Sequence, residues 1–298
     1  MTGLKVLRAV VLGVLVPGAV VMRVLDVPVL AAGQELQVRA RAIKPGEVLM
    51  VTVEGDGPVT AHVFDRDWAA YADGGGTWHV LVGIDLDTKP GRYDMVVRAG
   101  SGVLHRTLTV QPRVFPTRRL TVNPDLVHPP PEMEARVVRE ANHLRELWGH
   151  GAPERLWTEG FERPVPDPAN SAFGSRSIYN GEPRPPHTGA DFLSPAGRPI
   201  KAPNSGRVVL AEAQYFSGNT VIIDHGLGLF SMVAHLSEID VTVGDHVEKG
   251  QVVGKVGATG RVTGPHLHWT VRLNNARVDP LSLLYATGTA ATAGGAQP

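Results

Sequence analysis

The chain has 298 residues, which is enough for two domains that each bury a core of their own. Lys and Arg together number 29, and so do Asp and Glu, so the chain lacks the basic excess that is typical of nucleic-acid binders. It contains no cysteine, which excludes disulfides, thiolate metal sites and a lipid-modified N-terminal cysteine, and leaves His, Asp and Glu as metal ligands.

Residues 1–32 have the pattern of a secretory signal. Lys5 and Arg8 precede an apolar run over 9–22, and small residues follow at 31–33. The run is too short for an ordinary membrane-spanning helix, so we expect export rather than a buried strand or helix. The segment is either cleaved or kept as a membrane anchor. Either way, we expect the protein in the periplasm, the cell envelope or the extracellular space.

Residues 33–113 are predicted to form a small β-sandwich of immunoglobulin-like type. Short alternating runs, separated by turns rich in Gly and Pro, occur at 36–40, 48–53, 60–64, 78–82, 92–97 and 103–110. His62, His79 and His105 lie in separate runs without ligand spacing, so we interpret them as ordinary half-buried histidines. The module shows no chemistry of its own and is expected to space, position or recognise.

Residues 114–170 are predicted to be a linker that contains one helix, over about 132–149. Apolar residues recur there at helical spacing, at Met133, Val137, Ala141, Leu144 and Trp148. This stripe predicts a packing face rather than a cofactor site. At the other end of the chain, residues 287–298 are rich in Ala, Thr and Gly and are expected to be disordered.

The histidines of the last part of the chain are candidates for chemistry. His266, His268 and Thr270 alternate, so in a strand they would share one face. His187 and Asp191 are four residues apart, but the prolines and the glycine around them disfavour a helix, so a bend must bring them together. Three or four histidines and one carboxylate in a chain without thiols suit a zinc site with N and O ligands.

Several segments together resemble the lysostaphin-type (LytM) zinc metallopeptidases, which cut the peptide parts of bacterial peptidoglycan. The likeness covers roughly residues 171–284, and its motifs occur in order and at similar spacing. They are Phe173-Gly174-Ser175-Arg176, His187-Thr188-Gly189-Ala190-Asp191, Gly218-Asn219, Ala234-His235-Leu236 and Thr263-Gly264-Pro265-His266-Leu267-His268.

The resemblance implies a role for each matching residue. His187, Asp191 and His268 would bind Zn²⁺, and His235 and His266 would act on the attacking water and on the charge at the scissile carbonyl. Asn219 and Arg176 match positions expected to contact the peptidoglycan peptide, although an ion pair that holds a loop is an equal alternative for Arg176.

The sequence departs from the family pattern at Val233, where many members have Tyr. Since simple alternation puts Val233 and His235 on one face, we expect the groove to lack an aromatic wall or hydroxyl there.

We therefore predict a mainly β protein. An immunoglobulin-like sandwich and one connecting helix precede a C-terminal antiparallel β-sheet or barrel-like metallopeptidase domain over 171–286. The expected function is that of an exported zinc endopeptidase of peptidoglycan, with no nucleic-acid partner and with membrane contact only through an N-terminal anchor.

Three alternatives stay beside this interpretation. The first is a non-catalytic cell-wall-binding activator of other wall hydrolases, against which the five intact site positions count. The second is a biotinyl or lipoyl carrier, for which the lysine at a hairpin tip is missing. The third is an iron oxygenase with two histidines and one carboxylate, whose usual His-x-Asp spacing is absent.

Overall fold

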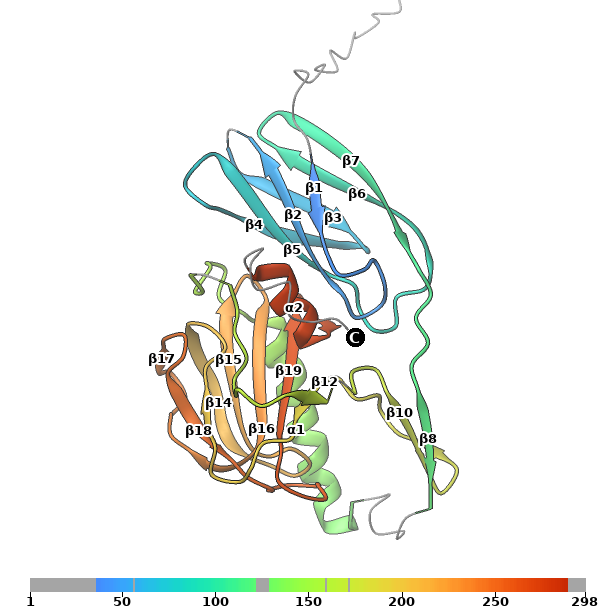
Figure 1. The fold of residues 1–298 in the computed structure, drawn as a ribbon, viewed down its shortest axis with the longest axis vertical. Coiled ribbons are helices and arrows are strands. Elements are labelled where there is room, and N and C mark those ends of the chain that lie inside the picture. Colours follow the sequence, from blue (N-terminus) through green and yellow to red (C-terminus); the bar gives the residue numbers. More distant parts are fainter. Residues whose placement is uncertain (1–35, 56, 122–128, 159, 171, 289–298) are drawn as a thin grey trace, which may run out of the picture.

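The computed structural model describes residues 36–55, 57–121, 129–158, 160–170 and 172–288, which form two β bodies packed end to end (Figure 1). The predicted secretory signal lies outside these residues. Of the predicted disordered tail 287–298, only Thr287 and Gly288 are described, and they are the last residue and the C-cap of a helix. Among the residues described, none of the helices has the length and apolar character needed to cross a membrane.

The first body is the predicted sandwich. Its strands are β1 (Gln37–Arg39), β2 (Val48–Glu54), β3 (Val59–Val63), β4 (Arg66–Ala72), β5 (Thr77–Gly83), β6 (Gly91–Ala99) and β7 (Gly102–Val110). The strand order β1-β2-β5-β4 followed by β3-β6-β7 is that of an immunoglobulin constant-type domain. Strand β4 pairs with β3 through its first half and with β5 through its second, and it is the one strand of the described sandwich that the sequence pattern did not reveal.

The second body contains a large antiparallel sheet that curls on itself. Its strands are β9 (Ala169–Asn170), β12 (Gly189–Phe192), β13 (Pro199–Lys201), β14 (Gly206–Gln214), β15 (Gly218–Gly226), β16 (Leu229–Ile239), β17 (His246–Val247), β18 (Val252–Val256), β19 (Leu267–Leu273) and β20 (Ala276–Val278). The order β17-β14-β15-β16-β19-β12-β9 makes β19 the neighbour of both β16 and β12. The candidate metal and catalytic residues lie on or beside these three strands.

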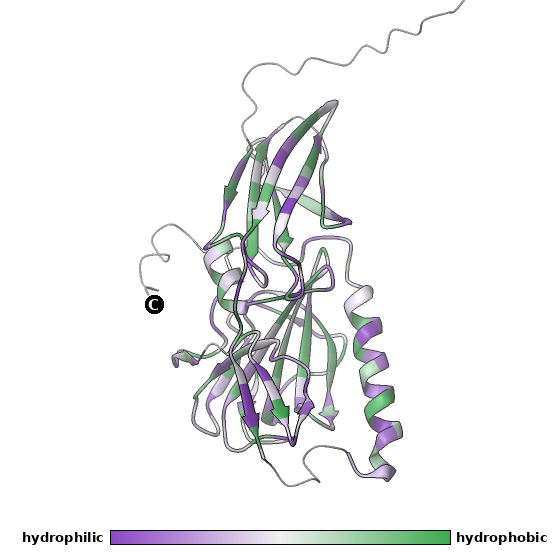
Figure 2. Cartoon of the chain, turned by 90° about the vertical axis from the view of Figure 1, so that its right-hand side faces the viewer, coloured by the Kyte–Doolittle hydropathy of each residue, from purple (hydrophilic) through white to green (hydrophobic). Residues whose placement is uncertain are grey.

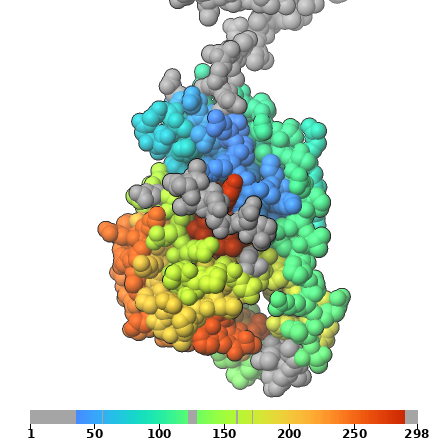
Figure 3. Space-filling view, in the orientation of Figure 1, coloured from blue at the N-terminus to red at the C-terminus, as the bar shows by residue number. Residues whose placement is uncertain are grey.

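A small sheet connects the two bodies along one side. The segment that leaves the sandwich forms β8 (Thr117–Leu120), which pairs in parallel with β10 (Arg176–Tyr179), and β10 continues into β11 (Glu182–Pro183). Figure 3 shows this segment running from the sandwich down the flank of the second body. The chain just before His187 is therefore hydrogen-bonded to the sandwich linker.

Two helices cover the second body. Helix α1 (Pro131–Gly149) alternates polar and apolar residues (Figure 2) and packs Leu144, Leu147 and Trp148 on the outer face of β14, β15 and β16. Helix α2 (Pro280–Thr287) was not predicted, because its eight residues are too few for a clear period. Its start is nonetheless encoded, since Asp279 accepts a hydrogen bond from the backbone N of Leu281 at 3.0 Å and Pro280 follows it.

The two bodies share one apolar core. The buried cluster runs without a break from Val48 and Ile84 in the sandwich to Val278 and Leu283 in the second body. The sandwich is therefore packed directly on the second body and is not joined to it by the linker alone.

A buried ionic network closes the same interface. Glu47, 5% exposed, accepts hydrogen bonds from Arg41 at 3.0 Å and from Ser282 at 2.7 Å. Arg41 also reaches Asp279 at 2.7 Å, and Arg113 contacts Glu47 at 3.3 Å. Such a network stabilises only when every member is paired, because each charge left alone in the interface is costly. The mainly β fold class expected from the sequence is confirmed. Helix α2 and the interface between the two bodies were not predicted.

Candidate metal centre and active site

Three side chains converge on one point of the second body. Nε2 of His187 lies 3.0 Å from Oδ1 of Asp191, and Nδ1 of His268 lies 2.8 Å from the same oxygen. These ligand-type atoms all lie within 4.8 Å of one another, and the three side chains are 13–24% exposed. The site therefore combines two imidazole nitrogens and one carboxylate oxygen at a position that water can reach.

Strand register places Asp191 and His268 face to face. In the antiparallel pairing of β12 with β19, Asp191 lies directly opposite His268, so both side chains leave the sheet on the same side. Gly189 opposes Thr270 in the same ladder, and a Cβ there would lie 2.8 Å from the His268 ring. The carbonyl oxygen of Trp269 would lie even closer, at 2.4 Å, so the backbone of β19 and the ring of His268 together leave room only for glycine between His187 and Asp191.

Thr270 orients the His268 ring. Nε2 of His268 lies 2.9 Å from Oγ1 of Thr270, which is two residues further on the same face of β19. In this structure Nδ1 donates to Asp191, and the Thr270 hydroxyl can donate to Nε2. A metal bound at Nδ1 would leave the ring proton on Nε2, which would then donate to Thr270. The alternation of His266, His268 and Thr270 was visible in the sequence, but a role for Thr270 was not predicted.

A β-bulge turns His235 toward the cluster. Ala234 lies opposite His268, whereas His235 has a φ of +68°, a left-handed conformation that non-glycine residues rarely adopt. The pairing of β15 with β16 shifts register at this point, and the backbone N of His235 donates to the carbonyl of Ser217 at 2.9 Å. The bulge is the reason why the side chain of His235 faces the cluster although the preceding residue, Ala234, already pairs with His268.

Because of the bulge, Val233 does not lie in the groove, and the prediction for this residue is wrong. Simple alternation put Val233 on the face of His235, in the groove. Instead, Val233 lies opposite Trp269, is 1% exposed and belongs to the apolar core. A small apolar residue there fills the core and leaves the groove wall unchanged.

His235 and His266 form a second pair beside the three ligand-type residues. Their ring centroids are 4.8 Å apart, and Nε2 of His266 lies 4.0 Å from Oδ1 of Asp191. Each ring has its Nδ1 on a backbone carbonyl, at 3.0 Å from Thr259 for His235 and at 2.9 Å from Gly264 for His266. Since a carbonyl only accepts, Nδ1 carries the proton in both rings, and Nε2 is left to bind or release one.

The surroundings set the charge of these groups. Burial opposes ionisation of Asp191, yet hydrogen bonds from His187 and His268 outweigh it and hold the pKa of the carboxyl far below its usual range. Burial lowers the pKa of His235 to about 4, and the charge of His268 adds to the effect. Burial likewise lowers the pKa of His268. At neutral pH the site therefore holds an anionic carboxylate beside the neutral imidazoles of His235 and His268.

The two residues expected to contact the substrate lie in different parts of the structure. Asn219 lies opposite Leu236, next to His235, and its backbone N donates to Oγ1 of Thr259 at 2.9 Å. Arg176 lies on β10, and its guanidinium is 3.6 Å from the carboxylate of Asp87 in the sandwich. The structure thus brings Asn219 to the histidine cluster and directs Arg176 toward the other body.

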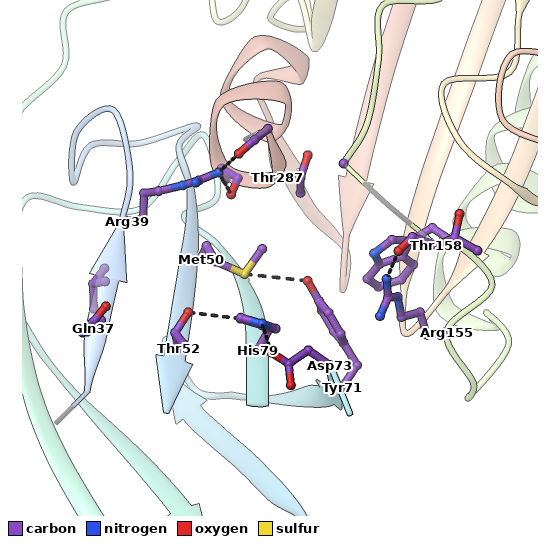
Figure 4. Close-up of a pocket in the computed structure, with 15 residues that line it drawn as sticks. Gln37, Arg39, Met50, Thr52, Tyr71, Asp73, His79, Arg155, Thr158 and Thr287 are labelled. Carbon is purple, nitrogen blue, oxygen red and sulfur yellow. Dashed lines mark hydrogen bonds and ion pairs between the residues drawn. The ribbon is translucent and has the colours of Figure 1, made fainter. Parts of the chain in front are cut away.

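Another hollow, of about 480 Å³, lies between the sandwich and the end of α2 (Figure 4). Its aromatic surfaces are already covered, since Arg155 lies 4.3 Å from the ring centre of Tyr71 and Trp157 is only 4% exposed. Arg39 there donates to the carbonyls of Tyr285 and Ala286 at the end of α2. None of the residues that line this hollow belongs to the histidine cluster.

Known proteins match the part of the chain that carries these histidines. Residues 185–280 match the model of peptidase family M23. Peptidoglycan DD-endopeptidase ShyB of Vibrio cholerae is 38% identical over 32% of this chain and 22% of its own length. DD-carboxypeptidase/endopeptidase Mpg of Neisseria meningitidis is 41% identical over 34% of this chain and 23% of its own length. The alignments thus span less than a quarter of these curated relatives.

One solved structure is similar over nearly its whole length. It is a protein of Pseudomonas aeruginosa described as a peptidase M23, and it is 38% identical to this chain. The match covers 83% of this chain and 97% of that protein with a TM-score of 0.67, so the sandwich and the linker are shared as well as the histidine-bearing body. With that likeness in sequence and fold, the chain belongs to peptidase family M23, the lysostaphin-type (LytM) metallopeptidases.

Proposed function

We propose that this protein is a zinc-dependent endopeptidase that hydrolyses peptide bonds in the stem peptides or cross-bridges of peptidoglycan. The observation that carries the proposal is the convergence of His187, Asp191 and His268, with His235 and His266 beside them. The family of the chain, and the peptidoglycan peptidases among its relatives, support the substrate class.

The donor set fits zinc. Catalytic zinc sites use three N or O ligands from the protein and leave one position for water, and two imidazoles with one carboxylate meet this need. Ligands about 2 Å from a tetrahedral ion are themselves about 3.3 Å apart, close to the 2.8 and 3.0 Å observed between the candidate atoms. The hydrogen bond from His268 to Thr270 supplies the outer contact that metal-bound histidines usually make.

When bound, zinc would supply a nucleophilic water at neutral pH and polarise the scissile carbonyl. The histidine pair then handles protons and charge. His235 is neutral at pH 7 and has its Nε2 free of a proton, so it can accept the proton of the attacking water. His266, held through Nδ1 on the Gly264 carbonyl, can present a protonated Nε2 to the developing oxyanion or to the leaving amine.

The remaining contacts complete the proposal. Asn219, next to His235 in the β15–β16 ladder, would hold the substrate backbone in the groove. For Arg176 the ion pair with Asp87 favours a role in holding β10 against the sandwich. A peptidoglycan substrate places the protein in the cell envelope or outside the cell, in agreement with the secretory signal expected at 1–32.

The test uses the purified full chain. We expect about one zinc per chain by metal analysis, and peptide fragments from digested sacculi whose masses identify the bond cleaved. A folded protein that holds zinc and binds sacculi but releases no fragment would instead support the non-catalytic alternative.

A further inference from the structure

Helix α1 is hydrogen-bonded to the turn that joins β14 to β15. The carboxylate of Glu140 accepts from the backbone N of Tyr215 at 2.7 Å, and this side chain is only 17% exposed. Arg136, one helical turn earlier, donates to the carbonyl of Ala213 at 2.8 Å and to the other oxygen of Glu140 at 2.6 Å. Two neighbouring side chains of α1 therefore hold the backbone where β14 ends and the turn begins.

The same turn holds the strained backbone of His235. The carbonyl of Ser217, two residues after Tyr215, accepts from the backbone N of His235 at 2.9 Å. The φ of His235, +68°, belongs to a left-handed conformation that persists only where neighbouring groups enforce it. Because the bond from Ser217 engages the strained residue itself, the position of the turn affects whether His235 keeps this conformation.

A second turn, around Thr259, lies against the first. A Cβ at Gly218 would lie 2.3 Å from Oγ1 of Thr259, and a Cβ at Gly260 would lie 2.5 Å from the carbonyl oxygen of Phe216. The carbonyl of Thr259 accepts from the imidazole of His235 at 3.0 Å. Since the two turns lie so close, a shift of the first also displaces the group that holds the imidazole.

The polar contacts of α1 are separate from its apolar ones. Leu144, Leu147 and Trp148 near its C-terminal end pack on the second body, whereas Arg136 and Glu140 lie in its first half. The apolar contacts therefore stay intact when the carboxylate of Glu140 is removed. The helix keeps its place, and the turn between β14 and β15 loses one of its hydrogen bonds.

We propose that Glu140 is a positioning residue for His235 and that it acts through the turn formed by residues 215–217. The helix that connects the two bodies thus takes part in building the active site. This inference rests on the proposed function, in which His235 accepts the proton of the attacking water.

The first measurement is turnover of a cross-linked muropeptide by the zinc-loaded full-length protein. Glu140→Ala should lower kcat about 10-fold, because a hydrogen bond to a charged group is worth roughly that factor. KM and bound zinc should not change. Glu140→Gln keeps an acceptor oxygen within reach and should restore most of the lost kcat. Glu140→Asp keeps the charge but is one methylene shorter, so it should behave as Glu140→Ala does.

Glu146→Ala, at an exposed position of the same helix, is the matched control and should behave as wild type. Hydrogen exchange adds a readout that does not depend on turnover. The backbone amide of His235 should exchange about 10-fold faster in Glu140→Ala than in the wild type. The amide of Ile223, buried in the middle of β15, should not change, whereas a general loss of stability would affect both amides.

Three results would each overturn the role of Glu140. They are an unchanged kcat in Glu140→Ala, no recovery in Glu140→Gln, and equal exchange of the His235 amide in Glu140→Ala and the wild type. A wild-type protein that holds zinc but cleaves no muropeptide would instead refute the proposed function. Exchange at His235 would then still decide whether Glu140 holds this residue in place.

Discussion

Asp191 and His268 lie opposite each other on neighbouring antiparallel strands, with 2.8 Å between Oδ1 and Nδ1, although 77 residues separate them in the sequence. A third residue, His187, reaches the same oxygen from the loop before β12. If these three groups hold the metal, each should be needed for binding, because a site with two ligands loses most of its affinity.

The first prediction is that Asp191→Ala and His268→Ala abolish bound zinc while the protein stays folded. Both side chains are partly exposed, so their removal leaves no large cavity in the core. Metal analysis after dialysis checks the metal, and far-UV circular dichroism checks the fold. Asp245→Ala, in an exposed turn, is the control and should keep its metal. Full zinc occupancy in Asp191→Ala would refute the assignment.

The second prediction concerns the proton-handling pair. His235→Ala and His266→Ala should keep most of the zinc but lose turnover of muropeptides by at least about 100-fold, as is usual when a general acid or base is removed. The result separates this pair from the ligands, whose loss removes metal and activity together. Retained hydrolysis in either variant would show that its role is wrong.

The third prediction tests the contact between Thr270 and His268. Thr270 is 2% exposed, and Thr270→Val has nearly the same shape but no hydroxyl. Loss of the hydrogen bond to Nε2 should weaken zinc binding about 10- to 100-fold, because the ring is no longer held in the metal-binding tautomer. Competition with a chelator measures the affinity. Thr263→Val, exposed on the loop before β19, should leave it unchanged.

The fourth prediction concerns the interface between the two bodies. Glu47→Ala leaves Arg41, Arg113 and Ser282 without their shared acceptor in a buried network. We expect a loss of about 3–5 kcal/mol in the free energy of unfolding, measured with denaturant. Glu54→Ala, at the exposed end of the same strand, should cost less than about 0.5 kcal/mol. Similar values for both variants would mean that the network does not hold the bodies together.

The fifth prediction is a pH effect at His225, which is buried and lies away from the metal ligands. Its Nδ1 donates to the carbonyl of Ser205, and burial lowers the pKa of the imidazole to about 4. In the unfolded chain the pKa is about 6.5, so between these values the unfolded state binds a proton that the folded state does not. His225 should therefore reduce stability as the pH falls from 6.5 to 4, by about 3 kcal/mol in total.

Denaturant unfolding at several pH values measures this effect. His225→Asn, which keeps a donor for Ser205, should be less stable at pH 7 because of the smaller side chain. Its stability should nevertheless change less between pH 6.5 and 4 than that of the wild type. His143→Asn, on the exposed face of α1, should keep the full wild-type dependence. Equal slopes for His225→Asn and the wild type would contradict the burial argument.

The sequence by itself determined the fold class and named the five candidate residues that the structure brings together. Alternation and turn residues predicted most strands, since each strand packs one face on a core. The motifs from His187 to His268 indicated the family, because their residue types occur together and in order. No local pattern revealed β4, whose run Arg66–Ala72 mixes charged and apolar residues, or α2, which spans only two turns.

Only the tertiary structure decided how these residues meet. The pairing of β12 with β19 is a long-range choice of register, which places Asp191 on His268. The bulge at His235 reverses the alternation that a strand pattern assumes, and so Val233 lies in the core. The contact of Glu47 with Ser282 joins segments that are 235 residues apart in the sequence. Periodicity reports which face of an element is buried, whereas register, bulges and loop contacts depend on which elements become neighbours.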